Sequence, residues 1–185
     1  MQIDVKDFIE MAEKSNSIAF FDLETAGLNA DYGTVLVGSI KELGKRPKAS
    51  NVSNPGDDRD LCVALRDELS KYKLWVSYYG KLFDVKFLNT RLLVHGEAQL
   101  PRVHHLDIYW TVRYYTTTAR RSQGHIISLL GEDEDKMSVS PDVWASALKA
   151  PEANLKKLRA RCNSDVTGLE QLYERMKHLV ANITR

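Results

Sequence analysis

The sequence has little cysteine, no long apolar run and almost no net charge. Its two cysteines, Cys62 and Cys162, show no metal-ligand spacing, so we expect reduced thiols in the core and a cytoplasmic location. No apolar run is long enough to cross a bilayer, and the first residues lack the basic and apolar regions of a signal peptide, so we expect no membrane partner. The net charge is +1, so any nucleic-acid binding must come from a local patch.

What the chain does contain is enough apolar material for a core. Hydrophobic residues make up 43% of its 185 residues and charged residues 28%, which is the composition of an ordinary globular protein. This length favours one domain that spans residues 1–185.

Apolar segments and turn residues follow one another in an order typical of an α/β domain. Early strands precede alternating helices and strands, which favours a mixed sheet with helices packed on it and a site at the carboxyl ends of its strands. The expected strands cover residues 17–21, 34–40, 49–52, 74–78 and 104–107. The expected helices begin at Asp4, near Leu61, after Gly80 and after Asp107, and a long last helix covers residues 155–179.

Two carboxylates stand where the first buried strand is expected to end. Asp22 and Glu24 have the i, i+2 spacing that places both side chains on one face of a strand. Their repulsion is costly unless a cation lies between them, and hard divalent cations take such oxygen ligands. Solvated acids at a strand end explain the same pattern, so the pair alone does not decide between the two interpretations.

Two further acids lie in apolar surroundings. Asp165 occupies the apolar seam of the last helix, where a buried carboxylate needs a partner; Arg161 at i, i+4 and a metal ion both satisfy that need. Asp84 lies between Phe83 and Phe87 at the start of a helix, where favourable placement near the helix N-terminus is the alternative explanation.

Three segments together resemble the motifs of the DEDD superfamily of 3′–5′ exonucleases. Residues 21–28 (Phe-Asp-Leu-Glu-Thr-Ala-Gly-Leu) are similar to the first motif. Residues 80–88 (Gly-Lys-Leu-Phe-Asp-Val-Lys-Phe-Leu) are similar to the second, although Tyr79 stands in place of the usual Asn. Residues 162–166 (Cys-Asn-Ser-Asp-Val) are similar to the third. The resemblance covers nearly the whole chain, and three motifs in register are far more specific than one.

Within that superfamily the chain is similar to the predicted ribonuclease H-like exonuclease branch, where the segments around Asp107 and Trp144 also recur. The resemblance implies a ribonuclease H-like α/β fold, a mixed β-sheet with helices packed on both faces. One departure concerns the residue beside the last acid. The usual Tyr or His before it is replaced by Arg161 or Ala160, and arginine cannot act as a general base but can hold a phosphate.

The resemblance further implies a two-metal site for Mg²⁺ or Mn²⁺. Asp22 would bridge both ions, Glu24 and Asp165 would complete the first, and Asp84 would support the second. The four acids would then be the catalytic and metal-binding residues. The remaining site residues would bind substrate: Thr25 and Leu28 would hold the terminal nucleotide and Arg161 a phosphate.

The expected function is therefore metal-dependent 3′–5′ hydrolysis of single-stranded DNA or RNA. The alternatives are a catalytically silent nucleic-acid-binding domain and a structure-selective endonuclease on the same fold. Asp107 is interpreted as a helix cap, and His104, His105 and His125 as structural residues.

Two basic segments offer further contacts to nucleic acid. Lys156, Lys157 and Arg159 could track a phosphate backbone, although such runs are usually solvated. Arg113, Arg120 and Arg121 mix with Tyr114 and Tyr115 as in single-strand binders, but helix packing is the favoured interpretation of the two tyrosines.

Overall fold

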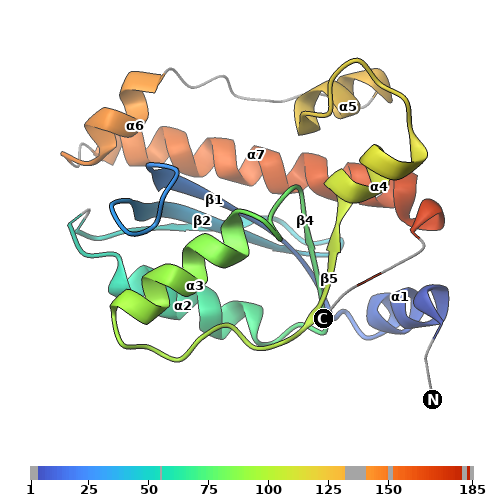
Figure 1. Cartoon of the computed structure of the whole chain (residues 1–185), viewed down its shortest axis with the longest axis horizontal. Coiled ribbons are helices and arrows are strands. Elements are labelled where there is room, and N and C mark those ends of the chain that lie inside the picture. Colours follow the sequence, from blue (N-terminus) through green and yellow to red (C-terminus); the bar gives the residue numbers. More distant parts are fainter. Residues whose placement is uncertain (1–3, 55, 132–140, 150–151, 181–182, 184–185) are drawn as a thin grey trace.

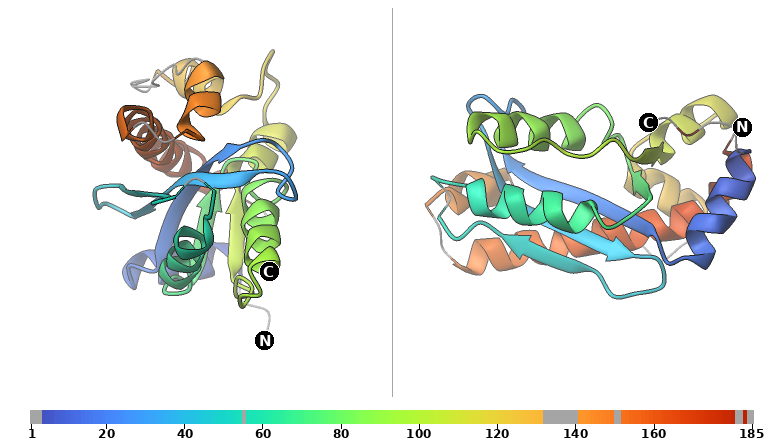
Figure 2. Two further views of the ribbon diagram at one scale, coloured as in Figure 1. Left: turned by 90° about the vertical axis from the view of Figure 1, so that its left-hand side faces the viewer. Right: turned by 90° about the horizontal axis from the view of Figure 1, so that it is seen from below.

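The computed structural model describes residues 4–54, 56–131, 141–149, 152–180 and 183. They form one sheet of five strands with helices on both of its faces (Figures 1 and 2). The strands are β1 (Ile18–Ala26), β2 (Thr34–Glu42), β3 (Lys48–Asn51), β4 (Leu74–Ser77) and β5 (His104–Asp107). The helices are α1 (Val5–Lys14), α2 (Arg59–Leu69), α3 (Asp84–Val94), α4 (Ile108–Tyr115), α5 (Gln123–Leu129), α6 (Pro141–Ala147) and α7 (Glu152–Met176), and a 3₁₀ turn follows at Lys177–Leu179.

The sheet is mixed, as the sequence predicts. Its strand order is β3-β2-β1-β4-β5. β1 pairs antiparallel with β2, which pairs antiparallel with β3, whereas β4 runs parallel to β1 and to β5. The long helix α7 covers one face of this sheet, and α2 and α3 cover the other (Figure 1). Among the described residues no helix is both long and apolar enough to span a bilayer.

The strand that carries Asp22 and Glu24 is longer than the sequence predicts. The strand expected over residues 17–21 stops before Asp22, but β1 continues to Ala26 because β2 pairs with it from Ala19 to Ala26. The parallel partner β4 pairs only with residues 18–20. Asp22 and Glu24 are therefore paired with β2 along one edge of β1. Along the other edge they lie beyond the last residue that pairs with β4, so side chains from other elements can approach them there.

Side-chain alternation along β1 decides which face the acids share. Phe20 packs edge to face against Tyr173 of α7, with ring centroids 5.4 Å apart. Because side chains two apart in a strand point the same way, Asp22 and Glu24 also face α7. Phe21 faces the other way, toward Trp75, at 5.9 Å.

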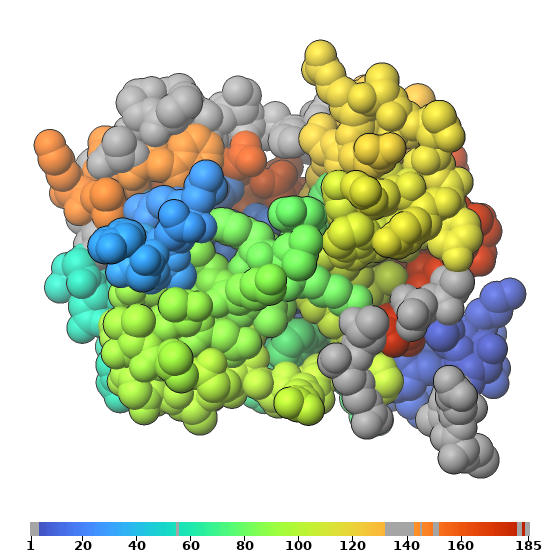
Figure 3. Space-filling view, in the orientation of Figure 1, coloured from blue at the N-terminus to red at the C-terminus, as the bar shows by residue number. Residues whose placement is uncertain are grey.

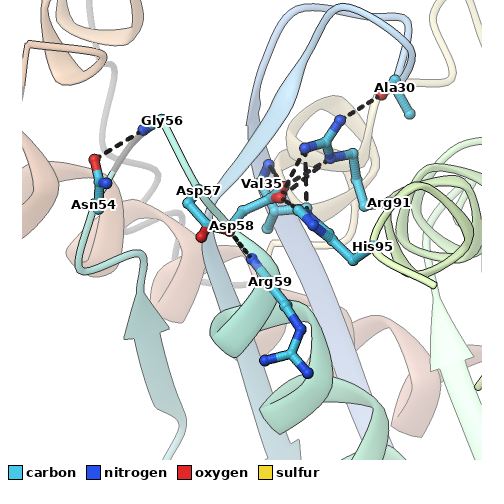
Figure 4. Close-up of polar contacts among 9 residues, drawn as sticks. All are labelled: Ala30, Val35, Asn54, Gly56, Asp57, Asp58, Arg59, Arg91 and His95. Carbon is cyan, nitrogen blue, oxygen red and sulfur yellow. Dashed lines mark hydrogen bonds and ion pairs between the residues drawn. The ribbon is translucent and has the colours of Figure 1, made fainter. Parts of the chain in front are cut away.

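A buried ionic cluster fixes the connection between β1 and β2 (Figure 4). The carboxylate of Asp58, fully buried, accepts hydrogen bonds from the Val35 N–H at 2.7 Å and from the Arg91 guanidinium at 2.9 and 3.0 Å. His95 Nε2 lies 2.6 Å from the same carboxylate. Arg91 also donates to the Ala30 carbonyl at 3.1 Å. The cluster thus ties α3 to the start of β2 and to the connection that leads into it.

Candidate active site

Three carboxylates converge between β1 and α7. Asp22, Glu24 and Asp165 each offer an oxygen, and these oxygens lie within 4.8 Å of one another. Asp165 reaches the pair because it lies on the seam of α7 that packs on β1. Glu24 is buried, and the Asp165 side chain is only 14% exposed. Sequence positions 22 and 165 are thus brought together by the packing of a helix on a strand.

The fourth acid comes from the start of α3, a helix on the sheet face opposite α7. Asp84 opens α3, is buried, and accepts a hydrogen bond from the Leu23 N–H at 3.0 Å. Burial raises its pKa to about 7, and the charges of Asp107 and Glu24 add to that effect. Burial also raises the pKa of Asp22 well above its usual value, and the strongest charge effects on it come from Asp84 and then Asp165. Without a cation, burial and the neighbouring carboxylates therefore disfavour the charged forms of Asp22 and Asp84.

The backbone before Asp84 is shaped to bring it close to the site. A Cβ on Gly80 would lie 2.6 Å from Ser77 and 3.1 Å from Asp84 Oδ2, so the tight approach requires glycine. Asp107 holds this turn because its carboxylate accepts from the N–H groups of Tyr79 at 2.7 Å and Lys81 at 3.1 Å. It also accepts from the N–H of Tyr109 at 3.1 Å, which confirms its expected role as the cap of α4. The two contacts to the turn were not expected from the sequence.

Arg161 contacts Glu24 more closely than it contacts Asp165. Its Nε donates to Glu24 Oε1 at 2.7 Å, and its Nη2 lies 3.5 Å from Asp165 Oδ2. Trp144 of α6 donates to Glu24 Oε2 at 2.9 Å, and the Arg161 guanidinium lies 5.4 Å from the Trp144 ring centroid. The i, i+4 pair with Asp165 is present, but the stronger partner lies 137 residues away in sequence, where helical spacing gives no signal.

Burial nevertheless dominates the electrostatics of Glu24. It raises the pKa of this carboxyl, although Arg161 and Trp144 oppose the shift. Cys162 adds a weak partner to the cluster, since its Sγ lies 3.2 Å from the Asp22 carbonyl oxygen and 3.5 Å from Oδ2. Both cysteines are free and buried, as expected.

An open pocket of about 420 Å³ borders Glu24. Thr25 and Leu28, the residues expected to hold a terminal nucleotide, both line it, together with Trp144. The Thr25 hydroxyl donates to the Gly27 carbonyl at 2.8 Å, and the Leu28 side chain is 83% exposed at the rim. The lining is Leu23, Glu24, Thr25, Gly27, Leu28, Phe83 and Trp144. Figure 3 shows this face hollowed between the blue β1–β2 connection with orange α6 on one side and the yellow α4–α5 segment on the other.

The other residues proposed from sequence have mixed outcomes. His105 is buried against the Ser77 hydroxyl at 2.7 Å, and burial lowers its pKa to about 3, so it is a neutral structural residue as expected. Arg159, which the sequence suggests as a contact to a phosphate backbone, donates hydrogen bonds to Asn51 and Glu152 within the protein. The packing interpretation of Tyr114 and Tyr115 is wrong: their exposed fractions are 71% and 51%.

The acidic cluster fits a hard divalent cation. Its donors are carboxylate oxygens, the ligands that such ions prefer, and they are close enough to share one ion. Burial first, and then the neighbouring carboxylates, raise the pKa values of Asp22 and Asp84, and a bound cation would offset both effects.

Comparison with known proteins places this geometry in a family. A family model described as the RNase H superfamily matches residues 19–177, a span that begins in β1 and includes all four acids. The chain belongs to the RNase H superfamily. The fold predicted from the sequence is thereby confirmed, and the chain belongs to a superfamily of nucleases. No curated protein matches the sequence.

Solved structures agree with the superfamily on the fold. The family B DNA polymerase of the hyperthermophilic archaeon Pyrobaculum calidifontis is similar over 86% of this chain, with a TM-score of 0.74 and 16% identity. This RNase H superfamily chain spans only 24% of that polymerase. NrnC of Brucella melitensis is similar over 88% of this chain and 72% of its own length, with a TM-score of 0.61 and 23% identity.

Proposed function

We propose that this chain is a divalent-cation-dependent nuclease that removes nucleotides from the 3′ end of single-stranded DNA or RNA. The observation that carries the proposal is the convergence of three carboxylates within 4.8 Å, with Asp84 beside them, next to an open pocket in an RNase H fold. In such a fold, buried acids that repel one another indicate a metal-dependent phosphodiester hydrolase.

We further propose that the acids hold two Mg²⁺ or Mn²⁺ ions. Asp22 is close to Glu24 and Asp165 and is also within reach of the charge of Asp84, so it is the residue that we assign to both ions. When bound, the ions would neutralise the scissile phosphate and lower the pKa of a bound water.

The pocket would hold the terminal nucleotide. Leu28 is exposed at its rim and offers an apolar surface to a base, and Glu24 and the half-buried Thr25, which line the same pocket, offer polar contacts to a sugar. Arg161 would bind a phosphate once the cation replaces it as the partner of Glu24. Arginine stays protonated, so it does not accept a proton from the attacking water.

A second function is favoured by a specific observation. Arg161 and Trp144 occupy both oxygens of Glu24, so this ligand is already paired inside the protein. A protein that keeps this pairing would bind nucleic acid without cleaving it.

The test is a time course on 5′-labelled single-stranded DNA and RNA of one length, in Mn²⁺ and in EDTA. The proposal predicts products that shorten from the 3′ end only with the ion, and protection of an oligonucleotide whose 3′ end is chemically blocked. Asp165→Asn should lose this activity, and Asp60→Asn, an exposed acid on α2, is the control. Internal cuts would indicate the endonuclease, and binding without cleavage would indicate the silent domain.

A further inference from the structure

Four aromatic rings form a continuous ladder that starts at the border of the acidic cluster. Tyr79 lies 4.9 Å from Tyr109, Tyr109 lies 5.2 Å from Trp110, and Trp110 stacks on Tyr114 at 5.9 Å with an interplanar angle of 23°. The first ring belongs to the turn after β4 and the other three to α4. We call these four side chains the aromatic ladder.

The ladder lies on the solvent side of α4. The helix buries Ile108, Thr111 and Val112 against the core, which leaves the opposite face to Trp110 and Tyr114. Tyr114 is 71% exposed and Tyr79 is 44% exposed, so packing against the core does not explain the two outer rings, and the two between them, Tyr109 and Trp110, are half-buried. Large aromatic surfaces left open to water in this way mark binding sites.

The position of Tyr79 adds a second observation. Its φ is +65°, a left-handed conformation that strains a residue with a bulky side chain. Asparagine, which the related motif usually carries, tolerates this conformation far better. A strained backbone therefore holds an aromatic ring at the edge of the acidic cluster, and because Tyr79 is 44% exposed, burial of the ring does not offset the strain.

The charge beside the ladder is positive. Arg113 lies over the Trp110 ring at 5.7 Å from its centroid, and Arg120 and Arg121 are exposed. The Arg121 carbonyl accepts a hydrogen bond from the Tyr78 hydroxyl, which ties its segment to the residue next to Tyr79. Residues 108–131 contain these three arginines and no acidic residue. Aromatic rings interleaved with arginines are complementary to the bases and phosphates of a single strand.

The ladder is continuous with the candidate active site. A Cβ on Gly80 would lie 3.1 Å from Asp84 Oδ2, and the N–H groups of Tyr79 and Lys81 on either side of Gly80 donate to Asp107. In Figure 3 the yellow atoms of the α4–α5 segment form one wall of the hollow on this face. A strand whose 3′ end lies at the acids can therefore continue onto the rings.

We propose that the aromatic ladder stacks the bases of single-stranded nucleic acid on the 5′ side of the scissile phosphate, while Arg113, Arg120 and Arg121 hold its backbone. This inference rests on the proposed function for the direction of the strand. On this inference the chain binds several nucleotides of the single strand and not the 3′-terminal nucleotide alone.

The test measures how affinity depends on length. Fluorescently labelled oligothymidylates of two and eight nucleotides are bound to the full chain in EDTA, so that no cleavage intervenes. Trp110→Ala and Tyr114→Ala should each weaken octamer binding roughly tenfold, because base–aromatic stacking has that size, and leave dinucleotide binding unchanged. Tyr115→Ala is the matched control, since Tyr115 is an exposed tyrosine of the same helix and outside the ladder. An octamer with abasic sugars on its 5′ side should bind the wild type as weakly as the normal octamer binds the variants.

A further variant separates a structural role from a binding role. Tyr79→Asn relieves the left-handed strain, so it should unfold at the same temperature or higher, yet bind the octamer more weakly. Arg113→Met should reduce the salt dependence of octamer binding. A lower unfolding temperature together with unchanged octamer affinity would show that the ring serves only the fold.

The inference is wrong if the ladder variants bind the octamer as the wild type does, if dinucleotide and octamer lose affinity equally, or if no oligonucleotide binds. Ladder-dependent binding to anionic lipid vesicles but not to oligonucleotides would also overturn it. Ladder-dependent binding without cleavage in Mn²⁺ would reject the proposed nuclease and leave the inference standing. Cleavage that is equally efficient in the wild type and in the ladder variants at every oligonucleotide length would reject the inference and leave the proposed nuclease standing.

Discussion

Replacement of Arg161 by methionine tests whether this side chain acts as the internal counter-ion of the acidic cluster. The substitution keeps most of the apolar volume and removes the charge that contacts Glu24 at 2.7 Å. Glu24 would keep only the Trp144 N–H as a strong partner. Removing one member of a fully buried ion pair costs ~3–5 kcal/mol. The Arg161 side chain is 22% exposed and Glu24 can take up a proton, so we expect a smaller loss than in a fully buried pair, ~2–3 kcal/mol.

Unfolding by urea in EDTA and in Mn²⁺ measures this effect. In EDTA, Arg161→Met should be less stable than the wild type by the amount above. Mn²⁺ should stabilise the variant more than the wild type, because the ion no longer competes with a guanidinium for Glu24 and Asp165. The matched control is Arg159→Met on the same helix, whose side chain is similarly exposed at 26% and pairs with the exposed Glu152. It should lose ~1 kcal/mol or less, with no change in the gain from Mn²⁺.

Two results would refute this reasoning. If Arg161→Met and Arg159→Met lost the same stability in EDTA, the contact with Glu24 would contribute no more than a surface pair. If Mn²⁺ stabilised Arg161→Met no more than the wild type, Arg161 and the ion would not share Glu24. In the cleavage assay Arg161→Met should bind substrate more weakly and keep residual activity. Arg161→Tyr, the residue usual in related enzymes, should raise the rate near neutral pH.

Three further predictions follow from the buried acids. Asp22→Asn should lower nuclease activity more than ~100-fold, since it removes a metal ligand, and raise the urea midpoint in EDTA, since it removes a source of repulsion. Wild-type activity in this variant would contradict the assignment of Asp22 as a metal ligand. Because the folded pKa of Asp84 is raised to about 7 from 3.8, the folded state holds its proton more tightly, and this group should lower the stability in EDTA by up to ~4 kcal/mol as pH rises from 4 to 7. Asp84→Asn should therefore show a shallower loss of stability over this pH range than the wild type. Asp58 has the opposite sign: partners lower its pKa to about 2, so it should contribute ~2.5 kcal/mol above pH 4 that is lost toward pH 2. Asp58→Asn should unfold at lower urea at pH 7, and the exposed Asp60→Asn should not.

Local patterns in the sequence were sufficient to predict which acids share a face. The i, i+2 spacing of Asp22 and Glu24 holds in β1 whatever its length, and the apolar seam of α7 places Asp165 against the sheet. Both follow from side-chain periodicity along one element, which each segment specifies by itself. The succession of strands and helices along the chain follows in the same way from alternating apolar segments and turns.

Contacts between distant segments could not be predicted from such patterns. The extension of β1 to Ala26 depends on its pairing with β2, and the pairing of Arg161 with Glu24 depends on where α7 crosses β1. The cluster of Asp58, Arg91 and His95 joins two helices that share no sequence signal.

The exposure of the aromatic residues on α4 shows why composition alone misleads. An eight-residue helix with four aromatic rings is expected to bury most of them, and hydrophobicity favours packing for each ring. Only one stripe of a helix can face the core, however, and in α4 that stripe is taken by Ile108, Thr111 and Val112. The cap at Asp107 fixes where the helix begins, and therefore which residues face outward. The same carboxylate fixes the turn that carries Tyr79. Asp107, a buried acid beside the candidate metal site, thus positions both the turn that carries Tyr79 and the helix that carries the other three rings of the ladder.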